Sequence, residues 1–262
     1  RAAIFVAVLV LLMGWESSAP RRVLEVKRMQ RWPGNVGTVV IGALLVRVFF
    51  PAAAVGMAFL AEDEGWGLLN VVAAPDWLKI VSAIILLDLI SYGQHVLFHA
   101  NPWLRRLHRI HHADLDIDVT TGVRFHPIEF LLSMMLKLGS VVLLGAPALA
   151  VLIFEVLLNA TAMFSHSNVR LAPGLDWWLR RVLVTPDMHR VHHSSVPRET
   201  HSNFGFNLPW WDYLFATYRA QPAAGHDGMT IGLRMFRDPA ELRLDRMLLQ
   251  PLRGDREEEI AE

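Results

Sequence analysis

The stretch "WLKIVSAIILLDLISYGQHVLFH" (residues 77–99) combines the two features that decide the fold. Its apolar part, Trp77–Phe98, is long enough to cross a bilayer, for which a helix needs about 20 residues. It ends in His95 and His99, whose spacing of four places both imidazoles on one helical face. Two imidazoles at this spacing can bind one metal ion. The stretch therefore predicts a membrane helix that carries metal ligands at one end.

The composition agrees with a membrane protein. Of the 262 residues 53% are hydrophobic and 19% charged, whereas a soluble domain has about 25% charged residues. The formal net charge is zero, so we expect no nucleic-acid partner, which would need a basic face. The chain has no cysteine, which excludes disulfides and thiolate metal sites.

Further apolar runs predict an all-α integral membrane bundle of about four to five transmembrane helices. One of them contains Arg47 and Pro51, which argues against a single straight span. The break "LGAP" (residues 144–147) divides the last two runs into a helical hairpin, because Gly and Pro interrupt helices. The additional runs are Ala2–Trp15, Val36–Leu60, Phe130–Leu144 and Ala148–Phe164.

Loop charges predict the orientation of this bundle. Residues 16–31 contain five basic and two acidic residues, residues 62–76 contain four acidic and no basic ones, and three arginines lie between 105 and 109. By the positive-inside rule, this alternation places every histidine cluster in a helical cap on the cytoplasmic side. It also argues against a merely apolar soluble bundle. A bacterial inner membrane and the endoplasmic reticulum are both compatible with it.

The sequences "LHRIHH" (107–112) and "MHRVHH" (188–193) repeat one histidine pattern. Histidines at i, i+3 and i+4 lie close together on one side of a helix. The residues at i and i+4 can serve one ion while i+3 reaches a second, so two such helices facing each other would enclose a pair of metal ions. Neutral imidazoles can share metals without the repulsion between cationic ones. These candidate ligands are His108, His111, His112, His189, His192 and His193.

Two isolated histidines are further candidate ligands, because His126 and His166 each lie at the cytoplasmic end of a membrane run. His201 and His226 belong to no pattern. Eight strong candidates and two fair ones exceed the four ligands of a structural zinc site and suit two metals. Imidazole binds zinc, copper, iron or nickel, so the ligand type leaves the metal open.

Several polar residues lie on the helical faces that carry the histidines. Asp88 and Tyr92 precede His95, while Glu155 and Asn159 precede His166. A carboxyl group inside an apolar helix is costly and usually has a role. We expect these four residues to line the site or to orient ligand histidines, with a helix-packing hydrogen bond as the alternative for Asp88.

Charged residues within and near the repeated motifs allow further predictions. Asp187 and Asp212 could accept hydrogen bonds from imidazole N–H groups. Arg109 and Arg190 occupy the same place in the two motifs, and we expect them at the surface, in solvent or against lipid headgroups.

Taken together, the motifs resemble those of the membrane fatty acid hydroxylase / sterol desaturase superfamily. The matching segments are the histidine boxes at 95–99, 108–112 and 189–193, "FHPIE" (125–129), "HSN" (166–168) and "NFGFNLPWWDYLFATY" (203–218). The resemblance implies a hydroxylase-like domain at 80–218, while the apolar runs and the polar composition predict N-terminal membrane helices with a cytoplasmic loop at 1–79 and a polar C-terminal tail at 219–262.

The resemblance also implies a non-haem centre of two iron ions that activates O2 at a C–H bond of a membrane lipid. Electrons would come from a separate donor such as cytochrome b5 or a ferredoxin system, and zinc could replace iron in a purified sample. The ligands carried over by position are the eight boxed histidines and His166. Some relatives have a further histidine where this chain has Arg170, so His126 or His201 could supply a tenth ligand.

The sequence therefore predicts an O2-dependent lipid hydroxylase, with desaturation of a lipid, sterol or carotenoid on the same site as the alternative within the class. A histidine-rich metal carrier is a second alternative, but transporters place ionisable groups near the bilayer midplane, whereas these histidines lie at helix ends. A catalytically silent lipid-binding relative is a third, which the complete boxes disfavour. The substrate, the oxidised carbon and the electron donor stay open.

Overall fold

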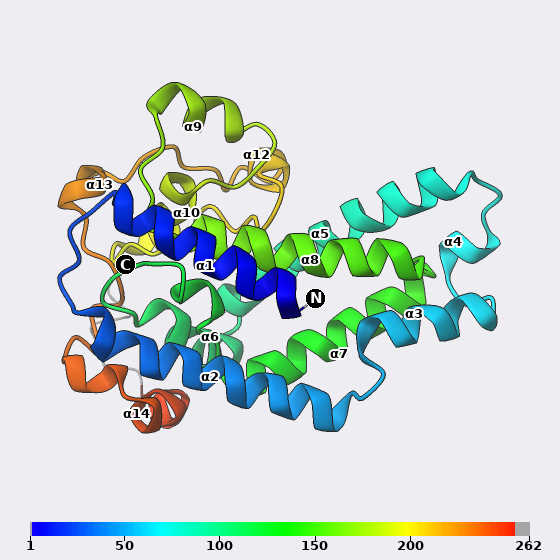
Figure 1. Cartoon of the computed structure of the whole chain (residues 1–262), viewed down its shortest axis with the longest axis horizontal. Helices are drawn as coiled ribbons and strands as arrows, with labels where there is room; N and C mark the ends of the chain where they lie inside the picture. The colour runs from blue at the N-terminus through cyan, green and yellow to red at the C-terminus, as the bar shows by residue number, and fades with distance from the viewer. Residues whose placement is uncertain (1, 255–262) are drawn as a thin grey trace.

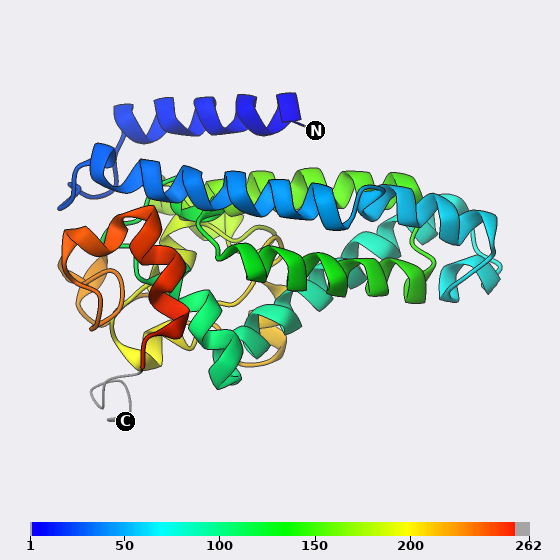
Figure 2. The same ribbon diagram turned by 90° about the horizontal axis from the view of Figure 1, so that it is seen from below.

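A computed structural model describes residues 2–254 of the chain, which are helical and form no β-strand within that range. Four segments are long and apolar enough to cross a membrane: Arg28–Val71, Asp76–Ala100, Pro127–Leu144 and Ala148–His166. Figure 1 shows their helices extending away from one end of the molecule, with α5 tilted against the others, and Figure 2 shows α1 (Ala2–Ser18) at the edge of this bundle. The predicted all-helical membrane bundle is confirmed.

The apolar run around Pro51 forms two helices instead of one. Helix α2 (Arg28–Phe49) ends just before Pro51, and α3 (Ala53–Asp63) begins just after it, followed by the short α4 (Leu68–Val71). A proline lacks the backbone N–H of a helix interior and clashes with the preceding turn. Ala54 and Ala58 of α3 are fully buried in the bundle core.

The predicted helical hairpin is present, formed by α7 (Pro127–Leu144) and α8 (Ala148–His166). Gly145 ends α7 with a φ of +60°, a left-handed conformation that favours glycine. A Cβ atom at Gly145 would lie 2.6 Å from the carbonyl oxygen of Trp66, so close approach also requires glycine there. Helix α5 (Asp76–Ala100) packs against both α7 and α8.

A cap of short helices covers one end of the bundle, opposite α3 and α4 (Figure 1). Its part from residue 219 to 254 packs against α2, where Leu242 and Met247 are fully buried beside Gly34. Residues 255–262, the end of the predicted polar tail, lie outside the described residues. The cap contains α6 (Pro102–His112), η1 (Thr121–Val123), α9 (Pro173–Leu179), α10 (Pro186–His192), α11 (Pro197–Thr200), α12 (Trp210–Leu214), α13 (Gly225–Gly228), η2 (Pro239–Leu242), α14 (Leu244–Leu249) and η3 (Gln250–Leu252).

Buried ion pairs join α2 to the loop that follows α6. Arg31, which is fully buried, donates to Asp114 at 2.7 Å and to Asp118 at 2.5 Å. Arg124 lies beside them and donates to the backbone oxygen of Ile110 at 2.8 Å. Burial alone would raise the pKa of Asp114, but Arg31 and Arg124 outweigh it and hold that pKa well below its usual value. The loop after α6 is thereby fixed from both sides.

Candidate metal centre

Nine histidines from α5, α6, α8 and the end of α10 gather where the bundle meets the cap, and each is at most 6% exposed. They form two groups, and within each group the candidate ligand atoms all lie within 4.8 Å of one another. The first group is His95, His99, His108, His112 and His192, and the second is His111, His166, His189 and His193.

The grouping follows the spacing within each motif. In α6 the histidines at i and i+4 belong to the first group and that at i+3 to the second. At the end of α10 the histidine at i+3 belongs to the first group, and those at i and i+4 belong to the second. The rings of His112 and His192 lie 4.6 Å apart, and those of His111 and His193 lie 4.7 Å apart.

Both motif helices start at defined caps. A proline opens each of them, where its missing N–H costs nothing. The side chain of Asn101 accepts from two backbone N–H groups at the start of α6, and that of Thr185 accepts from Met188 at the start of α10. These caps set where each helix begins, and hence the direction in which its histidines point.

Backbone carbonyls fix the orientation of several imidazoles. The Nδ1 of His95 lies 2.8 Å from the oxygen of Phe204, and that of His192 lies 2.7 Å from the oxygen of Ser202. Because a carbonyl oxygen only accepts, Nδ1 must carry the proton, and a neutral ring then has a bare lone pair on Nε2. The same contact joins His166 to Ala162 at 2.6 Å and His111 to Arg124 at 3.2 Å.

The Nε2 atoms fit a metal centre. Buried polar atoms without a partner are rare, and a bound ion is one explanation for them. In the second group, Nε2 of His166 lies 3.0 Å from that of His111, where lone pairs on both atoms would repel unless an ion lay between them, and 3.1 Å from that of His189. Six further Nε2 atoms of the two groups are buried and have no hydrogen-bond partner among the described residues: those of His95, His99, His108, His112, His192 and His193.

Burial also favours the protonation state that binds metals. It lowers the pKa of the imidazoles in the cap well below the usual histidine value, and neighbouring histidines add to this effect. Neutral imidazole is the form that ligates metal ions. The cap residues concerned are His111, His112, His189, His192 and His193.

Glu129 belongs to this centre although the sequence did not single it out. Its Oε1 accepts a hydrogen bond from Nδ1 of His108 at 2.7 Å, and both side chains are buried. A carboxylate in this position orients a ligand histidine and makes it more basic. An acidic residue in the first turn of the apolar helix α7 is the signal that could have revealed it.

The remaining histidines lie outside both groups. The side chain of His126 caps α7, where its Nδ1 accepts from the backbone N–H of Ile128 at 3.1 Å. His201 is exposed, and its ring lies 5.7 Å from that of His99. His226 is buried near Asp187, at 3.6 Å. Among residues 2–254 the structure thus brings together nine of the ten predicted ligands, without His126.

Asp88 and Tyr92 hold the cap onto α5 without touching a histidine of either group through a hydrogen bond. The carboxylate of Asp88 accepts from the indole N–H of Trp211 at 2.8 Å, together with groups of residues 207 and 208. The hydroxyl of Tyr92 lies 2.9 Å from that of Thr217. Both contacts position the segment whose Phe204 carbonyl holds the ring of His95.

Asp187 and Asp212 do not accept hydrogen bonds from the grouped imidazoles, so that prediction is wrong. Asp212 accepts from the backbone N–H groups of Phe204 and Gly205 at 2.8 and 2.9 Å, which supports the same segment. Asp187 pairs with Arg190 within its own helix. The imidazole N–H groups find backbone carbonyls and Glu129 instead.

Arg109 and Arg190 are buried at 3% and 0% exposure, so the prediction of a surface position is wrong. Arg109 donates to the backbone oxygens of Gln250 and Arg253, because the C-terminal segment folds over α6. Arg190 pairs with Asp187 and donates a hydrogen bond to the backbone oxygen of Ser167. Both arginines hold the cap together.

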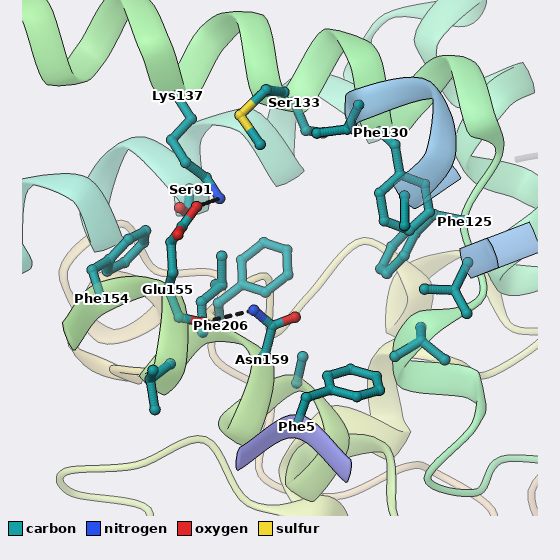
Figure 3. Close-up of a pocket in the computed structure, with 18 of the residues that line it drawn as sticks. Phe5, Ser91, Phe125, Phe130, Ser133, Lys137, Phe154, Glu155, Asn159 and Phe206 are labelled. Carbon is teal, nitrogen blue, oxygen red and sulfur yellow. Dashed lines mark hydrogen bonds and ion pairs between the residues drawn. The ribbon is translucent and has the colours of Figure 1, made fainter. Parts of the chain in front are cut away.

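A cavity of about 620 Å³ lies within the bundle and reaches residues that contact the histidine groups. Its walls come from α1, α2, α5, α7 and α8 and are mostly apolar, with Glu155 and Asn159 on one side (Figure 3). Two lining residues touch the histidine groups: the ring of Phe125 stacks on His111 at 4.4 Å, and Phe206 lies 5.0 Å from His95. The volume is in the range of small-molecule binding sites.

The profile of the family named "Fatty acid hydroxylase" matches residues 80–217, about half of the chain. The chain belongs to this family. It is 32% identical to ornithine lipid hydroxylase OlsE of Rhizobium tropici over 144 residues, which are 55% of this chain and 43% of that protein. It is 27% identical to alkylglycerol monooxygenase of Xenopus tropicalis over 158 residues, 60% of this chain and 34% of that protein. The matches thus span less than half the length of either relative, and no solved structure matches the chain.

Proposed function

We propose that this chain is a membrane-bound hydroxylase that uses O2 to oxidise a C–H bond of a lipid. The observation that carries the proposal is the closeness of two features: paired groups of buried histidine nitrogens, and a mostly apolar cavity of the membrane bundle whose Phe125 and Phe206 contact those histidines. The relatives named as an ornithine lipid hydroxylase and an alkylglycerol monooxygenase support a lipid substrate and monooxygenation.

The proposed cofactor is a pair of iron ions, one for each histidine group. A structural zinc site uses four ligands, so nine nitrogens in two adjacent groups suit two ions better than one. Imidazole accepts zinc as well as iron, and zinc binds such ligands more tightly, so purified protein can contain zinc. Bound iron would supply the O2-derived oxidant that no amino-acid side chain provides.

The chain's own residues would hold the histidine rings in place and shield the reaction site from water. Backbone carbonyls and Glu129 fix the histidine rings, while Phe125 and Phe206, which line the cavity beside His111 and His95, would help to exclude water from the reacting carbon. Hydroxylation puts one oxygen atom of O2 into the C–H bond and reduces the other to water, which consumes two electrons and two protons. We propose that cytochrome b5 or a ferredoxin system delivers those electrons to the cap.

We further propose that the cap faces the cytoplasm. At the opposite end of the bundle, residues 62–76 contribute four acidic and no basic side chains. Arg31 and Arg109 are buried, so they do not count among the exposed basic residues of the loops. Arg170, Arg181 and Arg198 add exposed positive charge on the cap side. Positive charge marks the cytoplasmic side of a membrane protein.

Metal analysis of the detergent-purified chain from iron-fed cells tests the centre. We expect about two metal ions per chain, and their loss in the variant His111→Ala/His192→Ala, which removes one nitrogen from each group. The matched control is His226→Ala, a buried histidine outside both groups, which should keep both ions. One ion or none, unchanged by the double substitution, would refute the paired centre.

Product analysis tests the reaction. Loaded protein with total membrane lipids, reductant and O2 should give products heavier by one oxygen atom, labelled when 18O2 is used. Products lighter by two hydrogen atoms would instead identify a desaturase on the same site. Absence of any O2-dependent product from protein that holds both metals would refute an oxygenase.

A further inference from the structure

The cavity carries a buried ion pair within the membrane bundle that the metal centre does not use. The ammonium of Lys137 on α7 lies 3.3 Å from Oε1 of Glu155 on α8, and both residues line the cavity. Figure 3 shows the pair on one wall, with Asn159 close by. Ionisable residues inside a membrane segment are expensive and usually functional.

A purely structural role explains the pair poorly. Two apolar side chains would join α7 to α8 without the cost of removing two charges from water. The side chain of Lys137 keeps 20% of its surface exposed and that of Glu155 keeps 9%, so the cavity can reach both. The pair therefore belongs to a binding surface as much as to a helix contact.

Asn159 extends this polar surface by one helical turn. Its amide nitrogen donates to the backbone oxygen of Glu155 at 2.7 Å, which leaves the side-chain carbonyl as an acceptor, and the residue is exposed to the cavity it lines. The side of the cavity across from Lys137 and Glu155 is apolar, with Phe125 and Phe130 there (Figure 3). A plain hydrocarbon chain would gain nothing from a donor and two acceptors placed on one wall.

The position of this polar surface is defined relative to the metal centre. Glu155 precedes His166 by eleven residues on α8, which at about 1.5 Å per residue places it roughly 16 Å along the helix from that histidine. This is about half of the ~30 Å hydrocarbon core of a bilayer. A ligand that touches both ends must therefore carry its polar group far from the carbon that meets the histidines.

We propose that Lys137, Glu155 and Asn159 bind a neutral group that both donates and accepts hydrogen bonds, a hydroxyl or a secondary amide, within the lipid that occupies the cavity. An ionic group does not fit, because Glu155 repels an anion and Lys137 repels a cation. An ester fits only in part, because it accepts from Lys137 but has nothing to donate to Glu155 or Asn159. The proposal rests on the proposed function only in taking the ligand to be a lipid.

Equilibrium binding without turnover tests this site. Four probes of similar chain length are N-octyldecanamide, a mid-chain octadecanol, octyl decanoate and octadecane, each competing with an uncharged fluorescent alkyl probe on the full chain in detergent. We expect the amide and the alcohol to bind about fivefold to tenfold more tightly than octadecane, as for one or two net hydrogen bonds, with the ester between them. The variant Lys137→Met/Glu155→Leu should lose this preference, since it removes both charges and strands neither.

Two further variants make the test decisive. Lys79→Met removes a lysine of α5 that does not line this cavity, and it should keep the preference. Asn159→Leu cannot strand a charge, and it should weaken the preference at least twofold even if the double variant does not fold. Equal binding of all four probes, a preference that survives both cavity variants, or no binding at all would overturn the proposal. The assay needs neither iron nor O2, so its outcome is independent of whether the chain is an oxygenase.

Discussion

Glu129 offers the sharpest test of how the histidines are held. Its carboxylate accepts from Nδ1 of His108 at 2.7 Å, between side chains that are 6% and 3% exposed. A hydrogen bond to a charged group in such a place contributes about 1.5–3 kcal/mol. Without it, His108 can exchange tautomers or rotate, and its Nε2 no longer points reliably into the first group.

We expect Glu129→Leu to weaken metal binding about 10- to 100-fold, the usual effect of removing a residue that orients a ligand histidine. This corresponds to about 1.4–2.7 kcal/mol, in line with the strength of the lost hydrogen bond. Glu129→Gln keeps an acceptor oxygen but not the charge, and it should lose less than about tenfold. The assay is anaerobic competition for Fe(II) between the detergent-purified protein and a chelator of known affinity.

The matched control is Glu25→Leu, which removes a carboxylate that is 62% exposed and lies outside the metal centre. Its metal affinity should equal that of the unchanged chain. If Glu129→Leu binds Fe(II) as tightly as this control, the orientation of His108 does not depend on Glu129 and the reasoning fails.

Three further predictions concern stability. Arg31→Met removes five hydrogen bonds and strands the buried carboxylates of Asp114 and Asp118, so it should lower the free energy of unfolding by about 3–5 kcal/mol in denaturant titrations; a loss below about 1 kcal/mol would contradict a structural role for the network. Burial raises the pKa of Asp116 to about 6, so between about pH 4 and 6 the folded state binds more protons at this group than the unfolded state does. The contribution of Asp116 to stability is therefore lost as the pH rises through that window. Asp116→Asn should therefore raise the free energy of unfolding by about 1–3 kcal/mol at pH 8, seen as a higher unfolding temperature, with little gain at pH 4. Equal effects at the two pH values would refute the assignment. Removing the metal with a chelator should lower the unfolding temperature of the unchanged chain but not of the double histidine variant, and a scan with and without chelator decides this.

The spacing of the histidines predicted how they divide between two groups, because that division depends only on the period of a helix. In α6 the residues at i and i+4 separate from the residue at i+3, and the same rule holds at the end of α10. The membrane helices and the α7–α8 hairpin were also predicted correctly. The signals for them, the length of an apolar run and a Gly-x-Pro break, depend only on residues that are neighbours in the sequence.

His126 shows where location along the chain misleads. It lies at the end of a membrane run, as His166 does, yet only His166 joins a group. The residue before a proline favours an extended backbone, and His126 precedes Pro127, so its side chain turns back to cap α7. The prediction that Arg109 lies at the surface was wrong for a different reason. Its side chain is buried by residues 250 and 253, which lie far along the chain.

The sequence by itself determined the membrane helices, the histidine spacings and the family, because each depends on residues that are close together in the chain. Only the tertiary structure decided which nitrogen of His95 faces inward, since the partner of its Nδ1, the oxygen of Phe204, lies 109 residues away along the chain. Every residue has a backbone carbonyl, so the pattern of side chains in the sequence cannot show which carbonyl accepts the hydrogen bond. Packing of the cap onto α5, through Asp88 and Trp211, brings that carbonyl to the ring.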